Sequence, residues 1–543
     1  MTFIELFIQG MRERTTKTVL KEIHPGFVRD VSGAYFLKMA GSVQAALEKH
    51  GVHKGDRVVL LAPNSARWIA IDVGILSFGA ICVPLYHRQE VSELAFMIQD
   101  CEPALVICWD EAVRTDLKTR LIQGYKIVTY EEVFQESRLI RVSHVLPSDC
   151  VTFCYTSGTS GKPKGAMISR ENMEYMLRQT KERVTETLGK VRNERVFHFL
   201  PFCFMGSRVM LHTQLLRAKP VWLSMDLNRL KDEMPICDPH YYLNVPAVLE
   251  RIKVGVEAVM THKSERIQSL YVAAKKYFEG APMTFRERIY GLLGKLIVFR
   301  SIKRQIGKHL KFLICGSAPL APSTQKWFQM LGIPVLQVYG LTETTAIITM
   351  DRLGEAEVGF VGKPIPGCEV KLTDDQELVC KGPNVFMGYW RRQENTKEIL
   401  KDGWLHTGDQ AEINAQGQYR ILGRIKNILV SESGHNIVPE PLEEQLKDLC
   451  PAIEHVVVVG HARPFLTAIV TGSVTETEID KAIVKLNEKL PHYRKIKSFY
   501  ISKESLSIDK GHLTANQKLR RQAIERYFED TIASMYQGQG KAL

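Results

Sequence analysis

Short apolar runs alternate with longer amphipathic stretches through the first two thirds of the chain. Val58–Leu61 and Gly79–Leu85 are largely apolar and predict buried strands, and Asn64–Leu76 between them carries apolar residues at helical spacing. The same rhythm continues to about residue 340, where 312–315 and 334–338 are further strand candidates. Strands that alternate with helices in this way are typical of an α/β fold.

The pattern changes near residue 355. From about 355 to 422, short apolar runs are separated by Gly/Pro turns such as Gly362-Lys363-Pro364, which predicts a small antiparallel β subdomain. After Arg424 a compact α+β segment continues to the end of the chain, with 456–459 as its clearest strand. We therefore expect an α/β region, a β subdomain and an α+β segment in succession.

Between two predicted strands, 151–154 and 166–168, lies a segment that combines glycines, hydroxyl side chains and lysines. Glycines allow close backbone approach, N–H groups and hydroxyls donate to phosphate oxygens, and lysines supply positive charge. The segment is not a Walker A motif, since only two residues separate Gly158 from Gly161 and Pro163 follows the lysine. A plain surface turn is the alternative, but such turns rarely carry so many phosphate donors. The predicted phosphate-binding residues are Thr156, Ser157, Gly158, Thr159, Ser160, Gly161, Lys162 and Lys164.

The segment Gln337–Thr344 places nucleotide-binding groups at the end of a predicted strand. The ring of Tyr339 can stack on a base, the Thr342 hydroxyl can bond a phosphate, and the Glu343 carboxylate can hold Mg²⁺. A strand-end turn without function is the alternative.

Both segments resemble motifs of the adenylate-forming enzymes, which include acyl-CoA synthetases, adenylation domains of peptide synthetases and luciferases. Four more segments match this family: Cys315–Leu320, Gly403–Asp409, Gly423–Asn427 and Leu513–Arg521. The last is similar to the L-T-P-T-x-K-x-x-R tail of the long-chain fatty acyl-CoA synthetases, and Gly388-Tyr389-Trp390 is also typical of that group. The resemblance covers nearly the whole chain.

The resemblance implies both a domain organisation and a nucleotide site. We expect an N-terminal domain, 1–424, of two flavodoxin-like α/β subdomains and a small β-barrel subdomain, followed by a small mobile α+β C-terminal domain, 425–543. In the family, the residue at Tyr339 packs against adenine, that at Thr342 contacts the α-phosphate and that at Glu343 reaches the metal. The remaining nucleotide-binding positions are Gly316, Ser317, Ala318, Gln337 and Gly340.

The later motifs add residues that the family uses in two half-reactions. Asp409 and Arg424 match the ribose-binding positions, Lys426 matches the hinge, and Gly434 lies in the coenzyme A loop. Lys518 takes the place of the lysine that enters the active site for adenylation. Chemistry calls for a cation there, because carboxylate attack on the α-phosphate builds negative charge on the phosphate oxygens and on the departing pyrophosphate.

One segment departs from the family pattern. Residues 199–208 align with a segment that usually carries His-x-x-Glu-Arg, but Phe204 and Ser207 replace the first two of these residues, while Arg208 remains and is a catalytic candidate. We expect Phe204 and Met205 to line the acyl pocket. The loss of two polar groups makes this pocket more apolar, which fits a greasy substrate.

The function implied is an ATP-dependent ligase that activates a medium- to long-chain fatty acid as acyl-AMP and transfers it to coenzyme A. Its products are acyl-CoA, AMP and pyrophosphate, and its cofactors are ATP, Mg²⁺ and coenzyme A. One alternative is a fatty acyl-AMP ligase that loads a carrier protein, although no obvious extra insertion of the kind typical of those relatives is present. The other is a non-catalytic acyl- or nucleotide-binding relative, which the replacements at Phe204 and Ser207 motivate.

Charge is concentrated in one segment. The chain has 72 basic and 60 acidic residues, a net charge of +12, and twelve basic against three acidic residues fall between Lys263 and Lys311. Six apolar residues interleave with these charges at helix-like spacing: Leu292, Leu293, Leu296, Ile297, Phe299 and Ile302. A basic helix on an anionic membrane and a solvated helix over the core both fit this pattern. Nucleic acid is a third candidate, but no recognition motif supports it.

Composition bears on location. No apolar run approaches the ~20 residues that span a bilayer, and the N-terminus lacks a charged leader, which argues against a secretory signal. Eleven cysteines without a C-x-x-C pair are typical of reduced thiols in a cytosolic protein. We expect a cytoplasmic enzyme, with peripheral membrane contact through 263–311 and a homodimer as open options.

Overall fold

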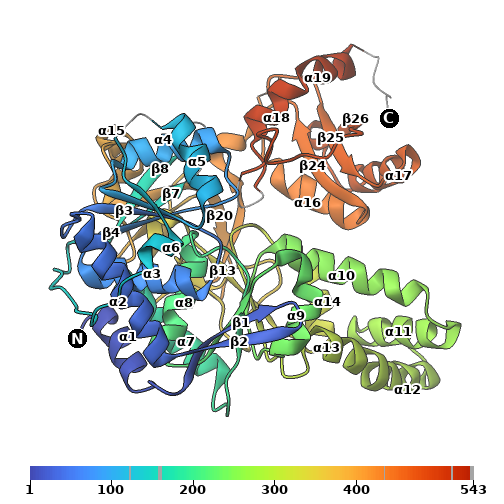
Figure 1. The fold of residues 1–543 in the computed structure, drawn as a ribbon. Coiled ribbons are helices and arrows are strands. Elements are labelled where there is room, and N and C mark those ends of the chain that lie inside the picture. The colour runs from blue at the N-terminus through green and yellow to red at the C-terminus, as the bar shows by residue number, and fades with distance from the viewer. Residues whose placement is uncertain (122–123, 157–161, 433, 515–517, 538–543) are drawn as a thin grey trace. The chain divides into compact units, whose positions relative to one another are not determined.

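A seven-stranded, mostly parallel sheet is the largest element of the structure, a computed structural model that describes residues 1–121, 124–156, 162–432, 434–514 and 518–537 (Figure 1). Across the sheet the strands are β18 (Gly388–Tyr389), β8 (Lys164–Ser169), β7 (Cys150–Thr156), β4 (Ile81–Leu85), β3 (Arg57–Leu61), β5 (Leu105–Cys108) and β6 (Ile127–Thr129). The strands from β7 to β6 are parallel, whereas β8 and β18 are antiparallel to their neighbours. The central strands are buried along almost their whole length, as expected for a parallel sheet.

Five helices connect or flank these strands: α2 (Gly33–Lys49), α3 (Ala66–Phe78), α4 (Val91–Cys101), α5 (Glu111–Arg120) and α6 (Tyr130–Val133). The predicted strands are confirmed, and the predicted helix at Asn64–Leu76 lies two residues further on. Its bounds follow from its caps, because the Ser65 hydroxyl accepts from the Trp68 N–H at 3.0 Å and Gly79 ends the helix at φ 83°.

Two further sheets complete the α/β region. The first has the order β2 (Phe27–Ser32), β1 (Thr18–His24), β10 (Val221–Ser224) and β9 (Val196–His198). The second has the order β11 (Leu243–Asn244), β12 (Leu313–Cys315), β13 (Val335–Tyr339), β14 (Thr349–Met350) and β15 (Lys363–Pro364). Their helices are α1 (Phe3–Arg12), α7 (Arg170–Leu188), α8 (Met205–Leu216), α9 (Leu230–Cys237) and α14 (Pro322–Met330). Because β12 and β13 are parallel neighbours, the loops that follow them leave the same edge of the sheet.

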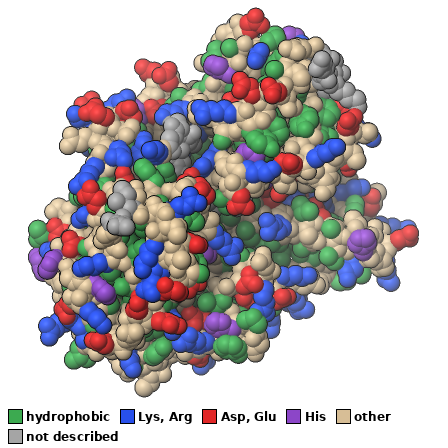
Figure 2. Space-filling view, turned by 45° about the horizontal axis from the view of Figure 1, so that its top comes forward, with side chains coloured by type: hydrophobic (Ala, Val, Ile, Leu, Met, Phe, Trp, Pro, Cys, Tyr) green, Lys and Arg blue, Asp and Glu red, His purple; other side chains and the backbone are tan. Residues whose placement is uncertain are grey.

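A set of helices between β11 and β12 carries the basic segment. It comprises α10 (Pro246–Thr261), α11 (Glu265–Phe278), α12 (Phe285–Gly294), a π-helical turn η2 (Lys295–Phe299) and α13 (Arg300–Gly307). Helices α10, α11 and α12 extend away from the sheets at the lower right of Figure 1. Figure 2 shows apolar and basic side chains interspersed on the visible face of this lobe.

The antiparallel β subdomain contains β16 (Glu369–Leu372), β17 (Glu377–Lys381), β19 (Leu400–Lys401), β20 (Trp404–Ile413) and β21 (Tyr419–Arg424), and α15 (Gln393–Ile399) precedes β19. The C-terminal α+β region contains β22 (Leu429–Val430), β23 (Asn436–Ile437), β24 (Ile453–Val459), β25 (Leu466–Gly472) and β26 (Ile496–Ile501). Its helices are α16 (Glu440–Leu449), α17 (Glu476–Asn487), α18 (Arg521–Tyr527) and α19 (Glu529–Tyr536). The predicted fold class is therefore confirmed.

Two units can be distinguished by their internal contacts. The first comprises Met1–Thr156, Pro163–Glu369 and Lys381–Leu405. The second comprises Ser157–Lys162, Val370–Cys380 and His406–Leu543. No disulfide joins any of the eleven cysteines. Among the residues described, no helix has both the length and the apolar character needed to cross a membrane.

Candidate active site

The turn after β12 brings the backbone unusually close to the next strand. A Cβ atom on Gly316 would lie 2.7 Å from Val338 Cγ2 and 3.0 Å from the Val338 carbonyl oxygen, so only glycine fits. Ser317 follows with a positive φ of 74°, a conformation that costs energy for a residue with a side chain. Ser317 and Ala318 are exposed beyond this close contact. This turn, whose residues are predicted to bind the nucleotide, is thus held in one backbone shape.

A second constrained turn follows β13. A Cβ atom on Gly340 would lie 2.3 Å from the Ala346 carbonyl oxygen, which again restricts the position to glycine. Tyr339 ends the strand half-buried, and Thr342 opens the short 3₁₀ helix η3 (Thr342–Thr344). Because β12 and β13 are parallel neighbours, both turns lie at the same sheet edge.

Gln337 turns its side chain inward. Its amide nitrogen donates to Gln325 Oε1 and to the Phe360 carbonyl oxygen, both at 3.0 Å, and its backbone N–H donates to Asp351 Oδ2 at 2.8 Å. Burial raises the pKa of Asp351 to about 7. The Asp351 N–H also donates to the Gln337 carbonyl oxygen at 3.0 Å, so both the side chain and the backbone of Gln337 brace β13 from the inside. Its nucleotide-binding role stays a prediction.

Glu343 has a partner that the sequence did not predict. The hydroxyl of Tyr389, on β18, donates to Glu343 Oε1 at 2.5 Å, and the Phe386 N–H donates to the Glu343 carbonyl oxygen at 2.9 Å. Lys164 Nζ lies 5.3 Å from the centre of the Tyr389 ring, within the range of a cation–π contact. A carboxylate, a hydroxyl and an ammonium group are therefore gathered beside the strand that follows the predicted phosphate loop.

The strands on either side of that loop are fixed next to the Thr342 turn. Thr156 on β7 stands opposite Lys164 on β8, and both are half-buried. The Cys154 thiol donates to the Cys203 carbonyl oxygen at 3.4 Å, and burial raises the pKa of this thiol to about 11. Lys162 is exposed. The predicted ligands Ser157, Gly158, Thr159, Ser160 and Gly161 lie outside the described residues.

Arg208 lies in the protein interior, with only 1% of its surface exposed. Its guanidinium pairs with Asp72 on α3 and donates to the Thr152 hydroxyl on β7, and Thr152 in turn donates to the Cys82 carbonyl oxygen at 2.6 Å. His212 Nε2 lies 2.7 Å from the same Asp72 carboxylate. Burial alone would raise the pKa of Asp72, but the Arg208 charge and the His212 hydrogen bond outweigh it and lower this pKa to about 2.

The predicted acyl-pocket residues lie at the start of α8. Phe204 precedes the first turn and is half-buried, with its ring centre 5.6 Å from that of Tyr86. Met205 is buried, as is Ser207. The aromatic series continues from Tyr86 to His87, whose pKa is lowered to about 4 by burial. The surroundings of Phe204 and Met205, which are predicted to line the acyl pocket, are therefore largely apolar.

In the second unit, the two predicted ribose ligands are paired with each other. Asp409 on β20 stands opposite Arg424 on β21, and Arg424 Nε lies 2.7 Å from Asp409 Oδ1. The Asp409 N–H donates to the Thr407 hydroxyl at 3.1 Å, and the Gly408 N–H donates to Glu377 Oε1 at 2.9 Å. The carboxylate is therefore held in one orientation.

Lys426 and Gly434 lie in short connections of the same unit. Lys426 belongs to the 3₁₀ turn η4 (Ile425–Asn427) directly after β21. Gly434 has a positive φ of 81° in the hairpin between β22 and β23, and its N–H donates to the Ser431 carbonyl oxygen at 2.9 Å. The neighbouring His435 ring stacks on Tyr493, with ring centres 4.1 Å apart.

Lys518 is joined to Thr514 by two hydrogen bonds. The Lys518 N–H donates to the Thr514 hydroxyl at 3.0 Å, and the Thr514 N–H donates to the Lys518 carbonyl oxygen at 2.8 Å. Three residues after Lys518, half-buried Arg521 pairs with Glu443, and its Nη1 donates to the Val458 carbonyl oxygen at 3.3 Å. The Lys518 side chain itself is exposed.

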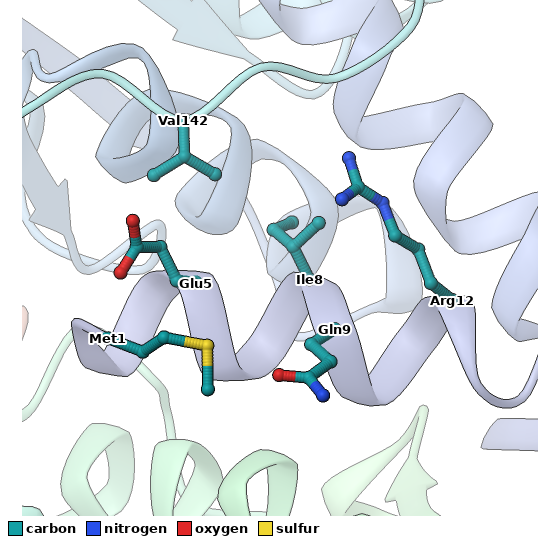
Figure 3. A pocket seen from close by; sticks show the side chains of 6 residues that line it. All are labelled: Met1, Glu5, Ile8, Gln9, Arg12 and Val142. Carbon is teal, nitrogen blue, oxygen red and sulfur yellow. The ribbon is translucent and has the colours of Figure 1, made fainter.

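A surface hollow elsewhere is unrelated to these residues. It is lined by side chains of α1, of which Glu5, Ile8 and Arg12 point toward Val142, with Met1 and Gln9 beside them (Figure 3). It contains none of the predicted site residues.

Residues 10–390 match the family of AMP-binding enzymes, and residues 426–540 match the AMP-binding enzyme C-terminal domain. The chain belongs to the AMP-binding enzyme family. The motif-based assignment to the adenylate-forming superfamily and its long-chain acyl-CoA synthetase group is confirmed. Enzymes of this group are AMP-forming acyl-CoA ligases that use ATP, Mg²⁺ and coenzyme A.

Similar proteins include the long-chain-fatty-acid–CoA ligase FadD15 of Mycobacterium bovis, 26% identical over 97% of this chain and 95% of the relative. Human long-chain-fatty-acid–CoA ligase 1 is 26% identical over 88% of this chain and 78% of the relative. Among solved structures, ATP-bound MatB from Rhodopseudomonas palustris has a TM-score of 0.75 and 22% identity over 98% of this chain and 100% of that chain. MenE from Bacillus subtilis with ATP and magnesium has a TM-score of 0.74 and 20% identity over 96% and 98%.

The residues around Glu343 fit the Mg²⁺ that AMP-binding enzymes use. In the described part of the chain, no three His, Cys, Asp or Glu side chains converge to form a metal site by themselves. Mg²⁺ in phosphate-transfer sites is commonly held by one or two carboxylates together with substrate phosphates and water. Glu343, oriented by Tyr389 next to the phosphate-loop strands, can supply such a carboxylate.

We expect Tyr389→Phe to reduce the turnover number of this protein roughly tenfold and to raise the Mg²⁺ concentration needed for half-maximal rate. The reason is that groups that orient a metal ligand affect metal affinity on that scale. The variant loses the hydroxyl but keeps the aromatic ring over which Lys164 lies. Initial rates at varied Mg²⁺ measure the effect. Tyr175→Phe is the matched control, since it removes a hydroxyl bonded to the Pro366 carbonyl oxygen. Equal Mg²⁺ dependence in both variants would contradict this role.

We expect Arg208→Met to lower the free energy of unfolding by about 3–5 kcal/mol, because it removes the charged partner of buried Asp72 and leaves this carboxylate only the contact with His212. Asp72→Leu/Arg208→Met should recover part of this loss. The native pKa of Asp72 lies below its ordinary value, so its stabilising contribution is present above about pH 4 and is lost as the pH falls toward 2. Urea unfolding measures each variant. Loss of turnover with unchanged stability would instead indicate direct catalytic contact.

Proposed function

We propose that this protein is an ATP-dependent fatty acid–CoA ligase that forms an acyl-adenylate and transfers the acyl group to coenzyme A. The observation that carries the proposal is the gathering of Glu343, Tyr389 and Lys164 beside the Thr342 turn, between the phosphate-loop strands and the end of β13. These groups suit a nucleotide with bound Mg²⁺. The substrate class comes from the family group and from relatives whose names specify long-chain fatty acids.

In the first half-reaction, a fatty acid carboxylate oxygen attacks the α-phosphorus of ATP and the bond to pyrophosphate breaks. We assign Thr156 and Lys164, with the loop between them, to the β- and γ-phosphates. Thr342 and Lys518 stabilise charge at the α-phosphate. Mg²⁺ neutralises phosphate charge when bound, and Glu343 would hold it.

The remaining nucleotide contacts are assigned to both units. Tyr339 packs against adenine and Asp409 accepts from the ribose hydroxyls. Arg424 holds the Asp409 carboxylate in place and contacts the ribose or phosphate. Arg208 is assigned a positioning role, because its guanidinium is engaged by Asp72 and Thr152 inside the fold.

In the second half-reaction, the coenzyme A thiolate attacks the carbonyl carbon of the acyl-adenylate and AMP departs. We propose that domains 1–424 and 425–543 rearrange about Lys426 between the two steps. The loop around Gly434 then serves coenzyme A, and Lys518 withdraws. Phe204 and Met205 contact the acyl chain.

Pyrophosphate release with carboxylic acids from acetate to oleate, with and without coenzyme A, tests the proposal. We expect turnover that rises with chain length and requires coenzyme A. Pyrophosphate release without coenzyme A consumption would indicate an acyl-AMP ligase that uses another acceptor. If none of these acids supports pyrophosphate release, the proposed function is contradicted.

We expect Lys518→Ala to slow adenylation by about 10²–10³-fold, since it removes a charge that acts on the developing oxyanions. Thioester formation from supplied acyl-AMP should change much less. Lys503→Ala is the matched control, because Lys503 is an exposed lysine of the same unit. The role of Lys518 is wrong if both half-reactions slow equally.

Peripheral contact with an anionic membrane through 263–311 and a homodimer stay predictions. Support for the membrane contact comes from the local excess of positive charge. Support also comes from the proposed substrate, because long acyl chains partition into bilayers.

A further inference from the structure

Helix α12 presents its small residues to the protein and its large apolar residues to solvent. A Cβ atom on Gly294 would lie 2.1 Å from the Leu270 carbonyl oxygen, and one on Gly291 would lie 2.7 Å from Tyr277 Cβ. The backbone of α12 is therefore packed directly against α11. This is the reverse of the usual surface helix, whose apolar stripe faces the core.

The opposite face of α12 and the turn after it carries an apolar row at helical spacing. Its members are Phe285, Ile289, Leu292, Leu293 and Leu296, and all are exposed, from 41% for Leu293 to 79% for Phe285. Residues at these intervals lie on one side of a helix. We call this set the α12 row. Isolated exposed apolar residues are common, but a continuous row of this kind marks an interaction surface.

A π-helical turn separates the α12 row from the core. Lys295–Phe299 forms η2, and from its last residue onward Phe299, Ile302 and Ile306 are buried in the hydrophobic core. The extra residue in a π turn shifts the apolar stripe around the helix axis. The six apolar residues singled out in the sequence therefore divide at this turn, with the first four exposed and the last two buried.

Basic side chains flank the α12 row. At 100° per residue, Arg288 and Lys295 lie along one side of the row and Arg286 along the other, and all three are exposed. Glu287 lies on the far side, where its carboxylate accepts from the Thr284 N–H at 2.7 Å. A second copy of the chain would bring the same positive charges into opposition, which disfavours self-association through this face.

We propose that the α12 row with its basic flanks is the surface by which the protein binds an anionic lipid bilayer, with Leu292 and Leu296 entering the acyl region. The inference rests on the proposed function in one respect: that function gives the reason for the contact, which is access to a fatty acid dissolved in the membrane. An apolar stripe bordered by Lys and Arg matches the chemistry of such an interface.

The structure also selects which basic residues to test. Lys303 Nζ donates to the Gly332 carbonyl oxygen at 2.7 Å, and burial lowers its pKa, so reversing this charge would disturb the fold. Arg288 and Lys295 are exposed and border the row. They are the appropriate positions for charge reversal.

The experiment is co-sedimentation of the full chain with phosphatidylcholine vesicles, with and without phosphatidylserine. We expect stronger binding to the anionic vesicles and a decrease as salt is raised. Leu292→Gln/Leu296→Gln and Arg288→Glu/Lys295→Glu should each lower the partition coefficient by about tenfold or more.

Two control pairs make the comparison specific. Leu139→Gln/Leu353→Gln alters two other exposed leucines elsewhere, and Lys181→Glu/Lys190→Glu makes the same change in charge. Both should bind vesicles as the unaltered protein does. Circular dichroism confirms that each variant is folded.

Turnover of octanoate, a water-soluble acid, separates this inference from the proposed function. It should be unchanged in all four variants, so loss of vesicle binding with retained turnover supports the inference. Equal binding to both vesicle types, or full binding by the α12 variants, would overturn it. So would a dimer in sedimentation velocity that the Leu292→Gln/Leu296→Gln change abolishes, because the row would then join two copies.

Discussion

The structure of the first unit depends on one buried charge cluster. Asp72, Arg208 and His212 are removed from water, so each charge must be matched where it lies. Matching them fixes α3 against α8 and, through Thr152, fixes both to the strand that leads into the phosphate loop. The start of α8, with Phe204 and Met205, is thereby held in register with that loop. Arg208, a catalytic candidate from the motif pattern, thus joins α8 to α3 and β7 inside the fold.

The order of elements and the family motifs were predictable from sequence because they depend on local spacing. The strands on either side of the phosphate loop and the turns after 315 and 339 are examples. Side-chain partners were not predictable, because Tyr389 and Glu343 are 46 residues apart and meet only after β18 pairs with β8. The pairing of Arg521 with Glu443 was missed for the same reason. Burial of Arg208 also depends on tertiary packing, which a motif does not specify.

The basic segment shows how a periodic pattern can mislead. At a constant helical period, the apolar residues from Leu292 to Ile302 are predicted to form one face. The π turn changes that period, and Gly291 and Gly294 provide a contact surface that hydrophobicity does not reveal. The structure divides the segment: it buries the second part, as a helix over the core requires, and exposes the first, for which membrane contact is a proposal.

The Tyr389 hydrogen bond also bears on the choice between cations. One oxygen of the Glu343 carboxylate is already engaged by the hydroxyl, so the group is suited to offer a cation its other oxygen. Ca²⁺ commonly takes carboxylates through both oxygens in large, flexible coordination shells, whereas Mg²⁺ prefers single oxygens in a compact octahedron. With Glu343 as the proposed metal ligand, a phenol 46 residues away in sequence would favour the smaller ion by limiting how that ligand can bind.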